Sequence, residues 1–265
     1  MGVKTQITLE GLHQLFPTYN FTKIIPTDSG IIDTTYIVYN EKQGYILKKY
    51  ERDIPNKITQ DKQLLKELYK KGLNVPICLD ECSGWYIYSK LEGVHPLHVQ
   101  SYHIQALGRF LAQLHKETTH LTCNADISFK EEILEALAYV KKHHFSYYKR
   151  FEFLKHFKHE GNALIHGDIF KDNTLFDGKK IGVIDFIDST CGSYLFDAAV
   201  ALVGFDVREN KHSHINIFLQ AYNQQVISKL NKQELISTLK IASHFYALKR
   251  IYMYKNTIQA KELLK

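Results

Sequence analysis

Two short segments of the chain carry the residues best suited to chemistry. Residues 164–173 read Leu-Ile-His-Gly-Asp-Ile-Phe-Lys-Asp-Asn, and residues 182–186 read Gly-Val-Ile-Asp-Phe. A carboxylate such as Asp168 can accept a hydrogen bond from an attacking hydroxyl group. The side-chain oxygens of Asn173 and Asp185 are ligands that Mg²⁺ prefers. Together these groups are what phosphoryl transfer from a nucleotide requires.

The spacing of these residues is specific. From the counts of His, Asp and Asn in the chain, the pattern His-x-Asp-x-x-x-x-Asn is expected by chance roughly 0.03 times. The pair Asp177-Gly178 between two apolar runs predicts a hairpin turn, which would fold the strand that ends at Asp185 back against the first segment. We therefore expect Asp168, Asn173 and Asp185 to converge on one point. The alternative is a loop that bonds its own backbone, with Asn173 as a turn residue.

The elements that must position these residues fall into two parts. An α+β, bilobal fold is expected, with a ligand site in the cleft between the lobes. The N-lobe, residues 1–92, should be a β sheet that covers the nucleotide, with strands near 21–26, 31–39, 45–50 and 85–91 and one helix near 58–71. The C-lobe, residues 93–265, should be helical and hold the catalytic loop and the acceptor pocket, with helices near 97–116, 131–144, 148–157 and from Tyr194 onward.

Composition narrows the class of protein. The chain has 265 residues, is 45% hydrophobic and carries a formal charge of +6 spread over scattered Lys residues, so we expect no nucleic-acid partner. The apolar run Leu195–Phe205 is too short to span a membrane, and the N-terminus lacks the apolar core of a secretory signal. We expect a cytoplasmic protein, a monomer or homodimer, with its four cysteines reduced.

The two catalytic segments resemble the aminoglycoside phosphotransferase and choline kinase superfamily, relatives of the protein kinases. Its pattern is His-Gly-Asp-x-x-x-x-Asn, then Ile-Asp-Phe or Ile-Asp-Trp, then an Asp that opens the next helix, here Asp197. The resemblance implies a protein-kinase-like fold, ATP and Mg²⁺ as cofactors, and transfer to an alcohol group of a small molecule. Within the superfamily the chain is most similar to the bacterial type II homoserine kinases, through residues 45–52, 72–76, 108–115 and 196–202.

For the nucleotide, the resemblance implies several contacts. Lys48 matches the lysine that binds the α- and β-phosphates, with Lys49 as the neighbouring alternative. Asp61 stands near the acidic partner of that lysine, although other side chains of the same predicted helix are in reach. Gly30 lies where a loop would cover the phosphates, and an ordinary hairpin turn is the other interpretation. Backbone groups from Ser89 to Leu91 should bind the adenine.

Two further residues are expected to support the catalytic loop. In this type of loop His166 packs beneath the base and bonds to backbone, so we expect a structural role for it. Asp197 should accept hydrogen bonds from the backbone of the loop. Neither residue is expected to act on the substrate.

The identity of the acceptor is open at this point. Beyond residue 205 the carboxylates are few and Lys and His are many, which argues against a polycationic aminoglycoside. A zwitterionic amino alcohol carries a carboxylate that Lys249 or Arg250 could bind. The segment 242–254 resembles the C-terminal helix of homoserine kinases, which carries two Arg. Only the second matches, at Arg250, because Phe245 occupies the first position.

The function expected is therefore a kinase for a small amino alcohol such as homoserine. Choline or ethanolamine, a sugar and an aminoglycoside are alternative acceptors. The aromatic residues of the last long helix could form a partial cage for choline or could simply pack in the core. A nucleotide-binding pseudokinase scaffold is an alternative of another class. We would expect a pseudokinase to have lost Asp168, Asn173 or Asp185, and all are present.

Overall fold

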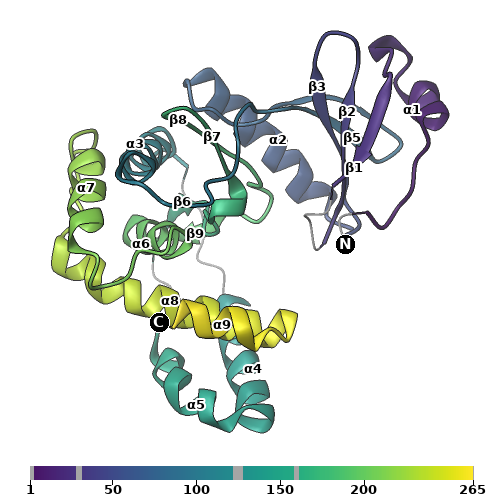
Figure 1. Cartoon of the computed structure of the whole chain (residues 1–265). Helices are drawn as coiled ribbons and strands as arrows, with labels where there is room; N and C mark the ends of the chain where they lie inside the picture. The colour runs from purple at the N-terminus through teal and green to yellow at the C-terminus, as the bar shows by residue number, and fades with distance from the viewer. Residues whose placement is uncertain (1–2, 28–31, 122–127, 158–160, 265) are drawn as a thin grey trace. The chain divides into compact units, whose positions relative to one another are not determined.

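The computed structural model describes residues 3–27, 32–121, 128–157 and 161–264. The chain divides into two compact units (Figure 1). Unit 1 comprises Met1–Glu92 and Gly182–Ile187, and unit 2 comprises Gly93–Ile181 and Asp188–Lys265. Among the described residues, no helix is long and apolar enough to cross a membrane.

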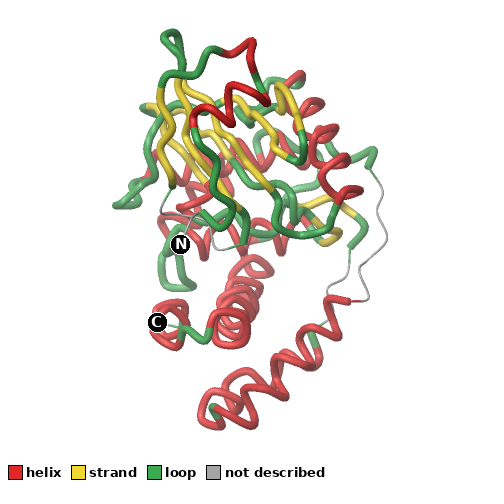
Figure 2. Tube along the Cα trace, turned by 90° about the vertical axis from the view of Figure 1, so that its right-hand side faces the viewer, coloured by secondary structure: helices red, strands yellow, loops and turns green. Residues whose placement is uncertain are grey.

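Unit 1 is built on a five-stranded antiparallel sheet, drawn in yellow in Figure 2. The strand order is β1-β2-β3-β5-β4. The strands are β1 (Lys23–Pro26), β2 (Thr34–Tyr39), β3 (Gly44–Lys49), β4 (Cys78–Cys82) and β5 (Trp85–Ser89). The four predicted strands are confirmed to within a few residues, whereas β4 and the helix α1 (Leu9–Leu15) were not predicted.

The two faces of this sheet pack against different elements. Leu47 on β3 is fully buried in a cluster that includes Leu12 of α1 and Trp85 of β5. Side chains alternate along a strand, so Lys48 belongs to the opposite face. On that face lie Tyr50 and a small cluster that includes Ile58 of α2 (Pro55–Lys70).

Unit 2 is mainly helical (Figure 1). Its helices are α3 (Ser101–Glu117), α4 (Ser128–His143), α5 (Phe145–Phe151), α6 (Tyr194–Gly204), α7 (His212–Asn223), α8 (Lys232–Tyr254) and α9 (Thr257–Leu263). Helix α3 packs on α7, and α6 packs on α8. Gly108 allows the first of these contacts, because a Cβ atom there would lie 2.8 Å from the carbonyl oxygen of Phe218.

Two short β pairs flank the catalytic segments. β6 (Ala163–Ile165) pairs with β9 (Thr190–Gly192), and β7 (Thr174–Asp177) pairs with β8 (Lys180–Val183). The predicted hairpin between β7 and β8 is confirmed, and Gly178 in its turn has a φ of 58°, a backbone conformation that glycine adopts without strain. Strand β9 was not predicted.

The prediction for the cysteines is wrong at one position. Cys78 and Cys82 are free thiols, whereas Cys191 of β9 is disulfide-bonded. Cys123 lies outside the described residues. Sequence spacing gave no sign of this bond.

Candidate active site

The catalytic loop, residues 166–173, leaves β6 and ends in a short 3₁₀ turn at Lys171–Asn173, just before β7. Asn173 lies beside Asp168. The Nδ2 atom of Asn173 donates to the backbone oxygen of Asp168 at 2.8 Å and to Oδ2 of the same residue at 3.4 Å. Because the amide nitrogen makes both bonds, the amide oxygen is the atom of Asn173 suited to bind a cation.

The carboxyl group of Asp168 is partly buried, and this environment changes its acidity. Burial raises the pKa of Asp168 to about 6, although the charges of Lys249, His166 and Arg250 act in the opposite direction. Lys249 and Arg250 of α8 are therefore close enough to Asp168 to act on its charge. A carboxylate with a pKa near neutral is well suited to accept a proton from a hydroxyl group.

Asp197 holds the backbone of the catalytic loop. It lies in the first turn of α6 and is fully buried. Its Oδ2 accepts a hydrogen bond from the backbone nitrogen of His166 at 3.1 Å, and its Oδ1 accepts one from Gly167 at 2.8 Å. Burial alone would raise the pKa of Asp197, but the hydrogen bond and charge of His115 outweigh burial and lower it. Asp197 therefore remains a charged acceptor for two loop amides.

A histidine that the sequence reasoning missed supports Asp197. The Nε2 atom of His115, on α3, lies 3.0 Å from Oδ2 of Asp197, and Nδ1 lies 2.7 Å from the hydroxyl of Tyr222 on α7. The ring of Tyr194 stacks on the imidazole at 4.2 Å. The available signal was a histidine four residues after Leu111, on the apolar face of the predicted helix.

The imidazole of His166 is also buried and bonded to the loop itself. The backbone nitrogen of Asp168 donates to Nδ1 of His166 at 3.2 Å, and only 2% of His166 is exposed. The ring is thus enclosed beneath the loop. This geometry suits a supporting residue better than a group that contacts substrate.

Helix α6 approaches the loop a second time at its C-terminal end. A Cβ atom on Gly204 would lie 2.6 Å from the carbonyl oxygen of Ile169 and 2.8 Å from the Cα atom of Phe170. Only a residue without a side chain fits there. Helix α6 therefore fixes the loop through Asp197 at one end and through close backbone contact at the other.

In unit 1, the predicted phosphate-binding lysine pairs with the predicted metal ligand. The Nζ atom of Lys48 lies 3.0 Å from Oδ1 of Asp185. Burial would lower the pKa of Lys48, but the charges of Asp185, Asp33 and Asp61 outweigh burial and raise it. Lys48 is therefore a cation on the face of the sheet that packs toward α2. Asp61, which is buried on α2, lies near it.

The other residues predicted to bind the nucleotide are Gly30, Ser89 and Leu91. Gly30 lies outside the described residues. The backbone nitrogen of Ser89 donates to the oxygen of Ile77 at 2.9 Å, and its hydroxyl accepts from the nitrogen of Ile77 at 2.9 Å. Leu91 lies beyond the last residue of β5 that pairs with β3. In the segment from Ser89 to Leu91, Leu91 is therefore the end whose backbone lies outside the pairing of β5 with β3.

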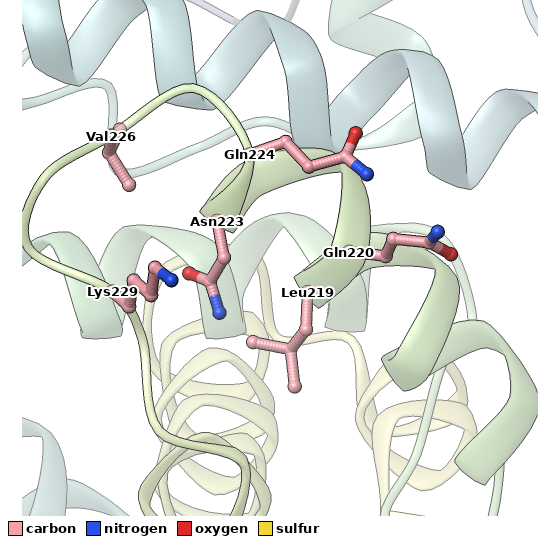
Figure 3. Close-up of a pocket in the computed structure, with 6 residues that line it drawn as sticks. All are labelled: Leu219, Gln220, Asn223, Gln224, Val226 and Lys229. Carbon is pink, nitrogen blue, oxygen red and sulfur yellow. The ribbon is translucent and has the colours of Figure 1, made fainter.

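One surface pocket of unit 2 lies apart from the predicted site residues. Figure 3 shows it at the C-terminal end of α7 and the loop that follows, lined by Leu219, Gln220, Asn223, Gln224, Val226 and Lys229. Asn223 in this pocket bonds the backbone of Leu230 through both ends of its amide, at 3.0 and 2.8 Å. None of the predicted site residues lines it.

The sequence matches the model of the phosphotransferase enzyme family over residues 23–226. The chain belongs to this family. A homoserine kinase of Janthinobacterium sp. (strain Marseille) is 25% identical over 76% of this chain and 71% of its own length. A macrolide 2′-phosphotransferase of Brachybacterium faecium has the same fold, with a TM-score of 0.68 at 16% identity over 96% of each chain. An amicoumacin kinase solved with AMP-PNP and Ca²⁺ also has a TM-score of 0.68, at 15% identity over 97% of this chain and 89% of its own.

Membership of this family and the homoserine kinase relatives establish the general activity. The chain is an ATP-dependent small-molecule phosphotransferase. Among the described residues, no group of three His, Cys, Asp or Glu side chains could hold a metal by itself. Asp185 of unit 1 and Asn173 of unit 2 each carry a side-chain oxygen of the kind that Mg²⁺ binds, and this ion commonly takes only one or two protein oxygens together with phosphates and water.

Proposed function

We propose that this phosphotransferase moves the γ-phosphate of ATP to the hydroxyl group of a small amino alcohol that carries a carboxylate, such as homoserine. The observation that carries the proposal is the position of two cations of α8, Lys249 and Arg250, near Asp168. An acceptor whose hydroxyl group meets Asp168 would have its carboxylate within the field of these cations. Arg250 offers the planar fork that binds a carboxylate through two parallel hydrogen bonds.

In this proposal Asp168 is the catalytic base. It accepts the hydrogen bond of the acceptor hydroxyl and takes its proton as the phosphoryl group is transferred. Asn173, bonded to Asp168, keeps the carboxylate in place, and Asp197 holds the loop backbone behind it. His166 serves as support beneath the loop.

The nucleotide side of the proposal uses residues of unit 1 and Asn173. Lys48 would bind the α- and β-phosphates, and Asp185 first, then Asp33 and Asp61, raise its pKa and keep it charged. Asp185 and Asn173 would hold Mg²⁺, which neutralises charge on the phosphates when bound. Backbone groups near Leu91 are better placed than those of Ser89 to bind adenine. We assign nucleotide covering to residues 1–92 and acceptor binding to residues 93–265, and we place the protein in the cytoplasm.

Other acceptors fit the residues of α8 less well. A polycationic aminoglycoside would be repelled by Lys249 and Arg250. A cage for choline would need open aromatic faces, but Phe245 is 5% exposed and Arg250 lies 5.2 Å over the ring of Tyr254. The hydroxyl of Tyr252 bonds to Glu135 at 3.3 Å. These aromatic groups are engaged within the protein, which favours an anionic acceptor.

The test is an acceptor screen with ATP and Mg²⁺, read as ADP release and as new phosphate esters by ³¹P NMR. The acceptors are L-homoserine, choline, ethanolamine, sugars and aminoglycosides, and Asp168→Ala is the control. Because 3-aminopropan-1-ol is homoserine without its carboxylate, the pair isolates that group. We expect L-homoserine to have a kcat/KM at least about 100-fold higher than 3-aminopropan-1-ol, and Arg250→Gln to remove most of this difference. Equal turnover of the two alcohols, or turnover equal to that of Asp168→Ala, would refute the proposal.

A further inference from the structure

Helix α8 contacts the catalytic loop on both sides of Asp168. The hydroxyl of Tyr246 donates a hydrogen bond to the carbonyl oxygen of Gly167, the residue before Asp168. The ring of Tyr246 packs against the ring of Phe170, two residues after Asp168, with 4.9 Å between centroids. Only 4% of Tyr246 is exposed, so the donor side of this hydrogen bond is buried. One residue therefore touches the loop before and after Asp168.

Burial raises the pKa of the Tyr246 hydroxyl, and the nearby charge of Asp168 raises it further. A phenol carries a single proton to donate, and the Gly167 carbonyl accepts it. Tyr246 therefore acts on Asp168 through the residues on either side of it in the loop.

Asp197 and Tyr246 hold different groups of the loop. Asp197 accepts from the backbone nitrogens of His166 and Gly167, whereas Tyr246 donates to the backbone oxygen of Gly167. Hydrogen bonds at both its nitrogen and its oxygen restrict rotation of the Gly167 backbone. This matters because Gly167 has a φ of 74°, and a glycine would otherwise move easily between conformations.

We propose that Tyr246 is a positioning residue that aims the carboxylate of Asp168 at the acceptor hydroxyl, an inference that rests on the proposed role of Asp168 as base. Tyr246 acts through the carbonyl of Gly167 and the ring of Phe170. The same helix carries Lys249 and Arg250 one turn later, so acceptor binding and the aim of the base are linked through α8. A misplacement of the base by about 1 Å can lower a rate on the order of 100-fold.

The test compares two variants that lose the same group. Tyr246→Phe keeps the ring and removes the hydroxyl. Tyr36→Phe removes a hydroxyl that also donates to a backbone oxygen, that of Thr5, but from the sheet of unit 1. For each protein we would measure kcat and KM with L-homoserine and ATP, and the melting temperature. Hydrogen–deuterium exchange of the peptide that contains residues 166–170 gives a readout without any substrate.

We expect Tyr246→Phe to lower kcat about tenfold or more, to leave the KM for ATP within about twofold, and to speed exchange in residues 166–170 about threefold or more. Tyr36→Phe should leave kcat, the KM for ATP and the exchange of residues 166–170 unchanged. Its shift in melting temperature should be similar to that of Tyr246→Phe. Unchanged exchange in residues 166–170, or a kcat equal to that of Tyr36→Phe, would overturn the positioning role. If the wild type and Asp168→Ala turn over L-homoserine equally, the proposed acceptor fails, and the exchange experiment still decides whether Tyr246 holds the loop.

Discussion

The Nζ atom of Lys48 and the Oδ1 atom of Asp185 lie 3.0 Å apart, although 137 residues separate them in sequence. The side chain of Lys48 is 18% exposed and that of Asp185 is 46% exposed. A pair this open to solvent contributes only about 0–1 kcal/mol to stability. The pair therefore matters for position, because it places the predicted phosphate-binding lysine beside the predicted metal ligand within unit 1.

Replacement of Lys48 should weaken nucleotide binding. We expect Lys48→Met to raise the KM for ATP about tenfold or more, because the variant loses the only charge that this side chain could offer to the phosphates. The matched control is Lys49→Met, since the Nζ atom of Lys49 lies 5.3 Å over the ring of Trp85, on the other face of the sheet. Steady-state kinetics with varied ATP measure both. Similar KM values for the two variants would contradict the assignment of Lys48.

Removal of the charge of Asp168 should stop the chemistry without stopping nucleotide binding. We expect Asp168→Asn to lower kcat by a factor of about 100 or more and to leave the dissociation constant for ATP within about twofold. Isothermal titration with a non-hydrolysable ATP analogue and Mg²⁺ gives the affinity, and ADP release gives the rate. Near-normal turnover by Asp168→Asn would exclude this residue as the base.

The same substitution should stabilise the protein at neutral pH. Burial raises the pKa of Asp168 from its ordinary value of 3.8 to about 6. Below pH 3.8 the group is protonated in both the folded and unfolded states, so its ionisation does not change the free energy of unfolding. Above about pH 6 the folded state holds a partly buried charge, which costs up to about 3 kcal/mol by linkage. The wild type therefore loses stability relative to Asp168→Asn as pH rises from about 4 to 6.

Urea unfolding of ligand-free protein in EDTA, at pH values between 4 and 8, measures this difference. We expect the free energy of unfolding of Asp168→Asn to exceed that of the wild type by about 1–3 kcal/mol at pH 7–8, and the two to approach each other near pH 4. Asp53→Asn, at an exposed carboxylate, is the control and should show no such trend. If the difference in the free energy of unfolding between Asp168→Asn and the wild type grew as pH fell, the pKa of Asp168 would not be raised by folding.

A methyl group on Gly204 should disturb the catalytic loop. The added Cβ atom would lie 2.6 Å from the carbonyl oxygen of Ile169, so the loop or α6 must move. We expect Gly204→Ala to lose about 1–3 kcal/mol of stability and to lower kcat. Gly11→Ala in α1 is the control, because its new Cβ atom would meet its nearest neighbour at 3.4 Å and alanine favours a helix. Equal stability of both variants would contradict the close contact.

Loss of the buried His115 should destabilise the protein, because His115 supports Asp197, which holds the catalytic loop. His115→Leu leaves the fully buried carboxylate of Asp197 without the imidazole 3.0 Å away, and breaking such a pair costs about 3–5 kcal/mol. Tyr222→Phe removes only the hydrogen bond on the far side of the ring and should cost about 1 kcal/mol. Urea unfolding ranks the two variants. If Tyr222→Phe were the more damaging, the support would not pass through the His115–Asp197 pair.

The sequence predicted the elements whose pattern is local. Alternating apolar residues located β2, β3 and β5, and helical spacing located α2, α3 and α4, each to within a few residues at most boundaries. Strand β4 was missed because it is a peripheral strand with exposed Leu79, Asp80 and Glu81, so no alternation marks it. A helix was predicted over 148–157. The structure instead has α5 followed by a 3₁₀ segment, because a periodicity of apolar residues does not distinguish the two over so short a span.

What the sequence determined by itself is the local arrangement of the loop, namely Asp168 with Asn173 beside it and a hairpin before an aspartate. These relationships span a few residues, so spacing and turn residues are sufficient to indicate them. Their convergence with Asp185 remains a prediction. Tertiary structure decided which side chains hold the loop, through His115 against Asp197 and Tyr246 against Gly167, pairs separated by 82 and 79 residues. Such contacts depend on how the helices pack. From the sequence alone, these buried residues cannot be distinguished from ordinary residues of the hydrophobic core.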